Sequence, residues 1–225
     1  MEIRESDVND KFSHIFIIIA PIAIPLFVFV GTFIFYPFID PKMIWLPLLF
    51  LYWIAVWGFT LWYRHKRGGV FSHERFKLTF KLRGEHVRLQ YIIVYGPLIF
   101  SIPLFIINYA AKMSLAMYLA VIVAALVNGP SEEIFWRACM NDACENAGFS
   151  EKKRLIYAPI VFALWHTAFV FHLYPHDETW VVGWVSIIIT TWISGVGWLW
   201  VLHRSGRLVP QCIYHSCANF LNVFP

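Results

Sequence analysis

Charged residues are scarce in this chain, and this scarcity bounds its class. Only 14% of the 225 residues are Asp, Glu, Lys or Arg, whereas soluble domains usually carry about 25%. Hydrophobic residues make up 59% of the chain. The composition therefore excludes an ordinary soluble domain and indicates a protein that lives in a lipid bilayer.

Several further patterns are missing, and each absence removes a class of function. Basic and aromatic residues are not interleaved in a soluble segment, so nucleic-acid binding is not expected. No H-E-x-x-H or G-x-S-x-G occurs, so neither the zincin pattern nor a serine nucleophile elbow is present. The cysteines form no C-x-x-C pair and indicate no disulfide framework; they are Cys139, Cys144, Cys212 and Cys217.

Long apolar runs predict about seven transmembrane helices, because a helix needs about 20 apolar residues to cross a bilayer. The expected spans are residues 15–38, 44–63, 91–110, 114–127 running on into the next segment, 155–173, 180–202 and 208–224. The predicted fold class is an all-α polytopic membrane protein. Polar residues in its later helices predict a polar cavity inside the membrane.

The longest polar stretch, residues 64–90, sets the expected orientation. It is rich in Lys and Arg, and such loops stay in the cytoplasm. With seven spans, the N-terminus of this multi-pass cell-membrane protein is then cytoplasmic. Contact with lipid headgroups is compatible with the same charges. Residues 1–112 hold the N-terminal helices and this loop, residues 113–225 hold the polar motifs, and both parts form one integral membrane domain.

The first polar motif is E-E-x-x-x-R, formed by Glu132, Glu133 and Arg137. Glu133 and Arg137 are four residues apart, so they share a helix face and are expected to pair. Glu132 is rotated by about 100° from Glu133, so its carboxylate is expected to point elsewhere and to serve chemistry. The structural alternative is that Ser131 caps a new helix whose first turn contains the two glutamates.

Two histidines form the other motifs. His166 lies in the apolar run 156–171, where a lone histidine often only bonds a neighbouring helix. His215 and Asn219 are four residues apart and can address one point in space. Counted from the cytoplasmic helix ends, Glu132, His166 and His215 lie roughly 12–20 Å deep, so they can meet in one layer.

A carboxylate, two imidazoles and an amide buried together are the parts of a hydrolase. In one design, Glu132 and His166 activate a water molecule, and His215 and Asn219 donate hydrogen bonds to the oxyanion. In the other, Glu132, His166 and His215 hold a zinc ion that acidifies its bound water. The residues alone leave both designs open.

The three motifs, in this order, resemble the signature of the CPBP intramembrane proteases. This family of CAAX proteases and bacteriocin-processing proteins includes Rce1-type and Abi-like members. Its pattern is E-E-x-x-x-R, then F-x-x-x-H, which Phe162 and His166 match here, and then H-x-x-x-N. The resemblance extends from about Met113 to the C-terminus.

The resemblance implies an endopeptidase that cuts a membrane-anchored substrate, and a prenylated CAAX protein is one expected substrate. The reaction would follow a metal-free or a zinc mechanism. Its partners would be that substrate and the lipid bilayer. The first alternative is a non-enzymatic bacteriocin-immunity or scaffold protein, and the second is a transporter or haem-binding membrane protein. The implied roles are water activation by Glu132 and His166, an oxyanion hole of His215 and Asn219, and support by Glu133, Arg137 and Phe162.

Overall fold

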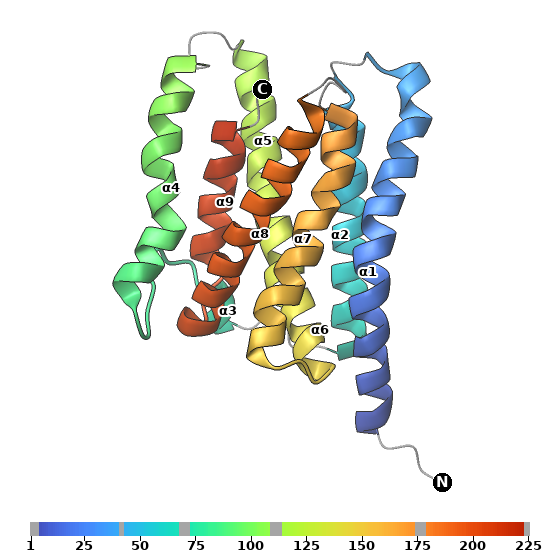
Figure 1. Cartoon of the computed structure of the whole chain (residues 1–225), viewed down its shortest axis with the longest axis vertical. Helices are drawn as coiled ribbons and strands as arrows, with labels where there is room; N and C mark the ends of the chain where they lie inside the picture. Colours follow the sequence, from blue (N-terminus) through green and yellow to red (C-terminus); the bar gives the residue numbers. More distant parts are fainter. Residues whose placement is uncertain (1–4, 41–42, 68–72, 109–113, 174–178, 223–225) are drawn as a thin grey trace. The chain divides into compact units, whose positions relative to one another are not determined.

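The computed structural model describes residues 5–40, 43–67, 73–108, 114–173 and 179–222, and its regular secondary structure in these ranges is helical throughout (Figure 1). The elements are α1 (Glu5–Phe35), η1 (Tyr36–Phe38), α2 (Trp45–Arg67), α3 (His73–Phe76), α4 (Val87–Asn108), α5 (Leu115–Glu132), η3 (Glu133–Cys139), α6 (Met140–Asn146), α7 (Glu151–Leu173), α8 (Trp180–Ser205) and α9 (Val209–Asn222). They form two compact units. Unit 1 comprises Met1–Val70 and Phe135–Val196, and unit 2 comprises Phe71–Ile134 and Gly197–Pro225.

Six stretches in the described ranges are long and apolar enough to cross a membrane, which confirms the all-α polytopic fold class. They are Lys11–Phe38, Trp45–Arg67, Val87–Ile107, Tyr118–Asn146, Glu151–His172 and Trp180–Ser205. The fourth runs on through the E-E-x-x-x-R motif, as expected. The seventh predicted span coincides with α9, whose 14 described residues cover about 21 Å, against a hydrocarbon core of about 30 Å.

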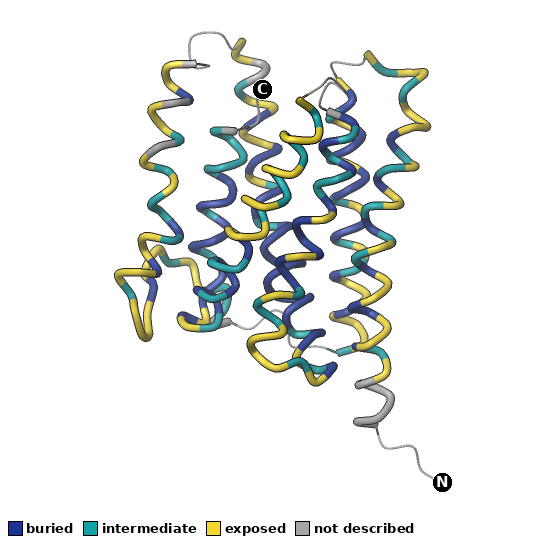
Figure 2. The backbone as a smooth tube through the Cα atoms, in the orientation of Figure 1, coloured by how far each residue is buried: buried dark blue, intermediate teal, exposed yellow. Residues whose placement is uncertain are grey.

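Large apolar side chains stay exposed along these helices, as lipid-facing surfaces require. Ile22, Ile92 and Ile193 are each 60–64% exposed, and Figure 2 shows exposed segments along α1, α4 and α8. Extended apolar surface of this kind marks contact with a membrane. The predicted boundary between residues 112 and 113 lies outside the described residues.

Unit 1 is organised around α1, which packs against α2, α6 and α7. Pro21 lies inside α1 and has no N–H, so the carbonyl of Ile17 loses its helical hydrogen bond. The Tyr157 hydroxyl, from α7, donates to this carbonyl at 2.6 Å. A neighbouring helix thus supplies the hydrogen bond that proline removes, as membrane helices with internal prolines require.

The core of unit 1 is aromatic. The rings of Tyr52 and Trp165 stack with centroids 3.8 Å apart and planes 5° from parallel. The Tyr52 hydroxyl accepts a hydrogen bond from Trp136 Nε1 at 2.8 Å. All three side chains are at most 2% exposed. Stacking and a satisfied indole fix α2, η3 and α7 to one another within this unit.

Unit 2 is built on α4, α5 and α9, and the packing of α5 on α9 is its most extensive helix contact. The two helices approach closely at Gly129. A Cβ atom at this position would lie only 2.6 Å from the amide nitrogen and hydroxyl of Ser216. Because glycine has no Cβ, it alone permits this approach. The close contact brings the start of the E-E-x-x-x-R motif beside the H-x-x-x-N motif.

Candidate active site

The helix that carries the two glutamates changes its geometry between them. Glu132 is the last residue of α5, and Glu133 begins the π-helix η3. Such segments are rare and frequently occur at functional sites. Ser131 does not cap a new helix, because its hydroxyl donates to the Val127 carbonyl at 2.6 Å within a continuous helix. The capping alternative is therefore wrong.

His215 lies between the two glutamates in unit 2. Its Nε2 is 2.9 Å from Glu132 Oε2, and its Nδ1 is 2.8 Å from Glu133 Oε1. His215 is 7% exposed, Glu132 2% and Glu133 0%. We expected the Glu132 carboxylate to point elsewhere. Instead, the 100° rotation between adjacent residues brings the two carboxylates to opposite nitrogens of one ring.

The two contacts constrain the protons of this buried trio. A ring nitrogen and a carboxylate oxygen at 2.8–2.9 Å share one proton. The trio therefore holds two protons, either as an imidazolium between two carboxylates or as a neutral imidazole with one glutamic acid. A proton can pass between His215 and Glu132 without any movement of the helices. This gives the trio the properties of an acid–base centre.

Asn219 lies one turn beyond His215 on α9, so the predicted common face of the two side chains is confirmed. Its Nδ2 is buried and has no hydrogen-bond partner among the residues that the structure describes. A buried amide without a partner is costly. It is therefore suited to a ligand oxygen that arrives at this turn.

The remaining motif residues lie in unit 1. The Arg137 guanidinium carbon is 3.8 Å from the centroid of the Phe162 ring, a cation–π contact. Nδ1 of His166 lies 3.1 Å from the Phe162 carbonyl, and since a carbonyl only accepts, Nδ1 carries the proton. Nε2 is then the basic nitrogen of His166. The pairing of Glu133 with Arg137, and the meeting of His166 with Glu132, stay predictions.

The trio alone is not a zinc site in this arrangement, and the zinc design, which also requires His166 of unit 1, stays a prediction. Both nitrogens of His215 are engaged by carboxylates at 2.8–2.9 Å, so neither offers a lone pair to a metal in this arrangement. Within the described ranges, the side chains of His, Cys, Asp and Glu form no group of three that could hold a metal ion. None of the four cysteines, which all lie in the described ranges, is in a disulfide bond. We therefore derive no catalytic step through a metal.

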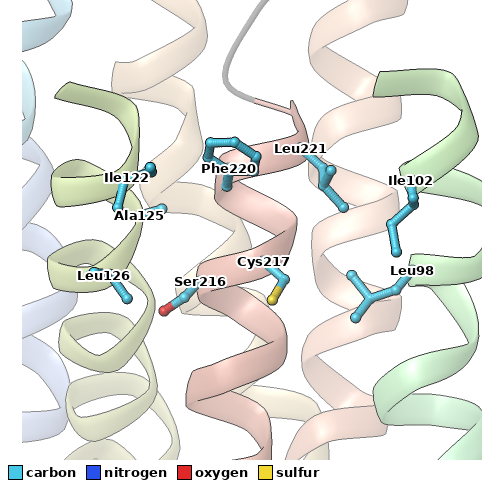
Figure 3. Close-up of a pocket in the computed structure, with 9 residues that line it drawn as sticks. All are labelled: Leu98, Ile102, Ile122, Ala125, Leu126, Ser216, Cys217, Phe220 and Leu221. Atoms are coloured by element: carbon cyan, nitrogen blue, oxygen red, sulfur yellow. The ribbon is translucent and has the colours of Figure 1, made fainter. Parts of the chain in front are cut away.

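Unit 2 contains an apolar pocket of about 280 Å³ (Figure 3). It is formed by side chains of α4, α5 and α9 and includes Ser216 and Cys217, which directly follow His215. Its other lining residues are apolar: Leu98, Ile102, Ile122, Ala125, Leu126, Phe220 and Leu221. The pocket can accept a hydrocarbon chain within a few residues of the imidazole.

Two positions that matter for the site were not among the sequence-based candidates. Gly129 sets the approach of α5 to α9, and Trp198 lies against the imidazole with its ring centroid 5.0 Å from that of His215. A glycine inside a helix costs about 0.5–1 kcal/mol relative to alanine, so Gly129 carried a signal of close packing. Trp198 carried none, since tryptophan is frequent throughout this chain.

The fold and the site together define an integral membrane protein with a buried acid–base centre among apolar helices. Residues 114–221, which carry all three motifs, match the family model for type II CAAX prenyl endopeptidase Rce1-like proteins. This region of the chain is therefore similar to the Rce1-like family, as the motifs predicted. No curated protein and no solved structure gives a match. The match indicates similarity to membrane proteases of the CAAX endopeptidase type.

Proposed function

We propose that this protein hydrolyses a peptide bond of a lipid-anchored substrate inside the membrane, with Glu132 as the general base. The observation that carries the proposal is the position of His215, held between two buried carboxylates one turn from an unsatisfied amide of Asn219. A buried acid–base group next to an oxyanion donor is what peptide hydrolysis requires.

In the first step, Glu132 takes a proton from water while the water oxygen forms a bond to the scissile carbonyl carbon. The motifs predict that His166 also takes part in activating this water, and this role stays a prediction. The carbonyl oxygen becomes an oxyanion, which Asn219 Nδ2 stabilises. As Glu132 is neutralised, its hydrogen bond to the Nε2–H of His215 weakens, and this N–H becomes available to donate to the oxyanion.

In the second step, the tetrahedral intermediate collapses. The carbon–nitrogen bond breaks, and Glu132 returns its proton to the leaving nitrogen as an amine forms. Glu133 keeps its hydrogen bond to Nδ1 throughout and so holds the ring in one orientation, as the acidic member of a catalytic triad does. Both carboxylates then regain their starting state.

The apolar pocket supports a substrate that carries a hydrocarbon chain. It lies on the α9 residues that follow His215, and no charged side chain lines it. Binding such a chain there would supply affinity through buried apolar area and would place the attached peptide at the trio. A prenylated C-terminal peptide, the substrate named for the matched family, has this chemistry.

The test is cleavage of membrane-anchored peptides by the purified chain, followed by mass spectrometry of the products. Peptides with a C-terminal prenylated cysteine motif are compared with unmodified and acylated versions. The native chain should cut the prenylated peptide, and Glu132→Gln should lower the rate by about 100-fold or more. Addition of a chelator should leave the native rate unchanged.

A matched control is Glu145→Gln. This glutamate lies in the next helical segment, is 61% exposed and pairs with Arg154, so its replacement should keep full activity. If Glu132→Gln retains native cleavage, Glu132 is not the base. If neither chain cuts any peptide and Glu132→Gln keeps the cellular effect of the native chain, the non-enzymatic immunity or scaffold hypothesis replaces the protease.

A further inference from the structure

The segment between α3 and α4 has an unusual surface. Residues 77–83, Lys-Leu-Thr-Phe-Lys-Leu-Arg, run without helical structure and alternate basic or polar residues with apolar ones. Leu78 is 86% exposed and Phe80 is 63% exposed. Figure 2 shows the loop at the foot of α4 as exposed over most of its length. Two large apolar side chains thus stand beside exposed Lys77 and Lys81.

Unit 2 holds this segment firmly in place. The Leu82 side chain is 6% exposed in a core cluster with Val94, Trp198, Val201 and Tyr214. The Leu82 amide donates to the Tyr91 hydroxyl at 3.2 Å, and the Tyr95 hydroxyl donates to the Phe80 carbonyl at 3.4 Å. These contacts hold the backbone of the segment against α4. The side chains of Leu78 and Phe80 are therefore kept exposed.

The same segment is tied to the turn that precedes α9. Arg83 Nε donates to the Ser205 carbonyl at 3.1 Å, and the Leu208 amide donates to the Arg75 carbonyl at 3.0 Å. His215 follows this turn on α9. The segment is thus in direct contact with the start of the helix that carries the imidazole.

The position along the chain sets the level in the membrane. α4 begins at Val87, and the stretch Val87–Ile107 is long and apolar enough to span a bilayer. Residues 77–83 end only a few residues before it, so they lie at the headgroup level. Residues 75–90 contain five basic residues and one acidic residue. Basic clusters directly next to a transmembrane helix bind anionic lipid headgroups.

We propose that residues 77–83 form a docking site for anionic phospholipids, with Lys77, Lys81 and Arg83 against the phosphates and Leu78 and Phe80 inserted among the upper acyl carbons. The basic side chains are complementary to the negative charge of the headgroups. Insertion at the membrane–water interface removes the apolar side chains from water. This inference is independent of the proposed peptidase activity.

The experiment uses the full chain with a nitroxide on Leu78→Cys, reconstituted in vesicles of phosphatidylcholine with increasing fractions of phosphatidylglycerol. Collisions with oxygen report immersion in the bilayer, and collisions with a water-soluble nickel chelate report exposure. The label should move from nickel-accessible to oxygen-accessible as the phosphatidylglycerol fraction rises. High salt should reverse the movement, because it screens the headgroup charges.

Two double variants separate this site from general charge. Lys77→Gln with Lys81→Gln should lower the affinity for phosphatidylglycerol roughly 30-fold, so the label stays exposed to nickel. Lys152→Gln with Lys153→Gln removes the same charge from an exposed turn of α7 and should leave the response intact. The unmodified chain, labelled in parallel, gives the background from native cysteines.

Immersion to the same depth in pure phosphatidylcholine would overturn the headgroup proposal. A label that stays in water at every lipid composition would overturn it as well, and would assign the exposed segment to a protein partner. Loss of the response in both double variants would show that net charge alone governs it, which contradicts a defined site at residues 77–83.

Discussion

His172 and His215 are equally buried, each 7% exposed, but their hydrogen-bond partners differ in charge. In unit 1, His172 Nε2 donates to the Phe29 carbonyl at 3.3 Å, and Nδ1 accepts from the Tyr36 hydroxyl at 3.1 Å. Both partners are neutral. In unit 2, both nitrogens of His215 meet carboxylates.

This difference distinguishes the structural role of His172 from the acid–base role proposed for His215. A neutral imidazole between a carbonyl and a phenol is a satisfied polar group that fastens α1 to α7 within unit 1. An imidazole between two carboxylates shares its protons and can exchange them with a substrate. Burial alone therefore does not mark a functional histidine in this protein, whereas the charge of its partners does.

The largest predicted effect is a difference in unfolding free energy between variants of the two histidines. His215→Leu leaves two carboxylates buried side by side without their proton donor, and we expect a loss of about 3–5 kcal/mol in unfolding free energy. His172→Leu leaves only neutral groups unsatisfied and should cost about 1–3 kcal/mol. Unfolding in denaturant, monitored in detergent, measures both. Equal losses would contradict the distinction between the two histidines.

The second prediction concerns the amide beside His215. Asn219→Ala removes the proposed oxyanion donor, and the cleavage rate should fall by about 100- to 1,000-fold with little change in stability. Tyr36→Phe is the matched control because it removes a neutral partner of His172, and it should cleave at the native rate. Kinetic assays on one prenylated peptide compare them; a native rate in Asn219→Ala would remove this residue from the mechanism.

The third prediction tests the helix approach that positions the trio. In Gly129→Ala, the new methyl group clashes with Ser216, which should cost about 1–3 kcal/mol and lower cleavage about 100-fold through displacement of His215. Gly58→Ala is the control, since no atom lies within 4 Å of its Cβ position, and it should gain about 0.5–1 kcal/mol. Similar behaviour of the two variants would show that the close approach is unimportant.

The smallest effect is expected for a neutral hydrogen bond between two helices of unit 1. Tyr157→Phe removes the hydrogen bond to the Ile17 carbonyl that Pro21 leaves exposed, and the unfolding free energy should fall by about 1 kcal/mol. Cleavage should be unchanged. Thermal denaturation measures the change in stability and the peptide assay measures cleavage. A large loss of activity would contradict a purely structural role for this hydrogen bond.

Much of the fold could be predicted because the bilayer imposes simple rules on sequence. Six of the apolar runs that were expected to span the membrane correspond to long helical stretches, and the stretch Tyr118–Asn146 continues through the glutamates as expected. The length of α9 was not predictable, since the apolar character of residues 208–224 does not reveal where its helix begins and ends.

The candidate site was only partly predictable. The residues His215 and Asn219 could be assigned to one face of a helix because this requires only the α-helical repeat. The partner of Glu133 could not be predicted from the sequence. His215 is 82 residues away along the chain, and only the packing of α5 on α9 brings it near. The change to a π-helix at Glu133 also leaves no sequence pattern that the α-helical rules detect.

The catalytic role of the buried trio is tested most directly by comparing His215→Gln with His172→Gln in one peptide-cleavage assay. Intrinsic fluorescence checks that both variants fold. We expect that His215→Gln folds and loses cleavage, whereas His172→Gln cleaves at the native rate. If His215→Gln cuts the peptide as fast as the native chain, the buried trio is not the catalytic centre.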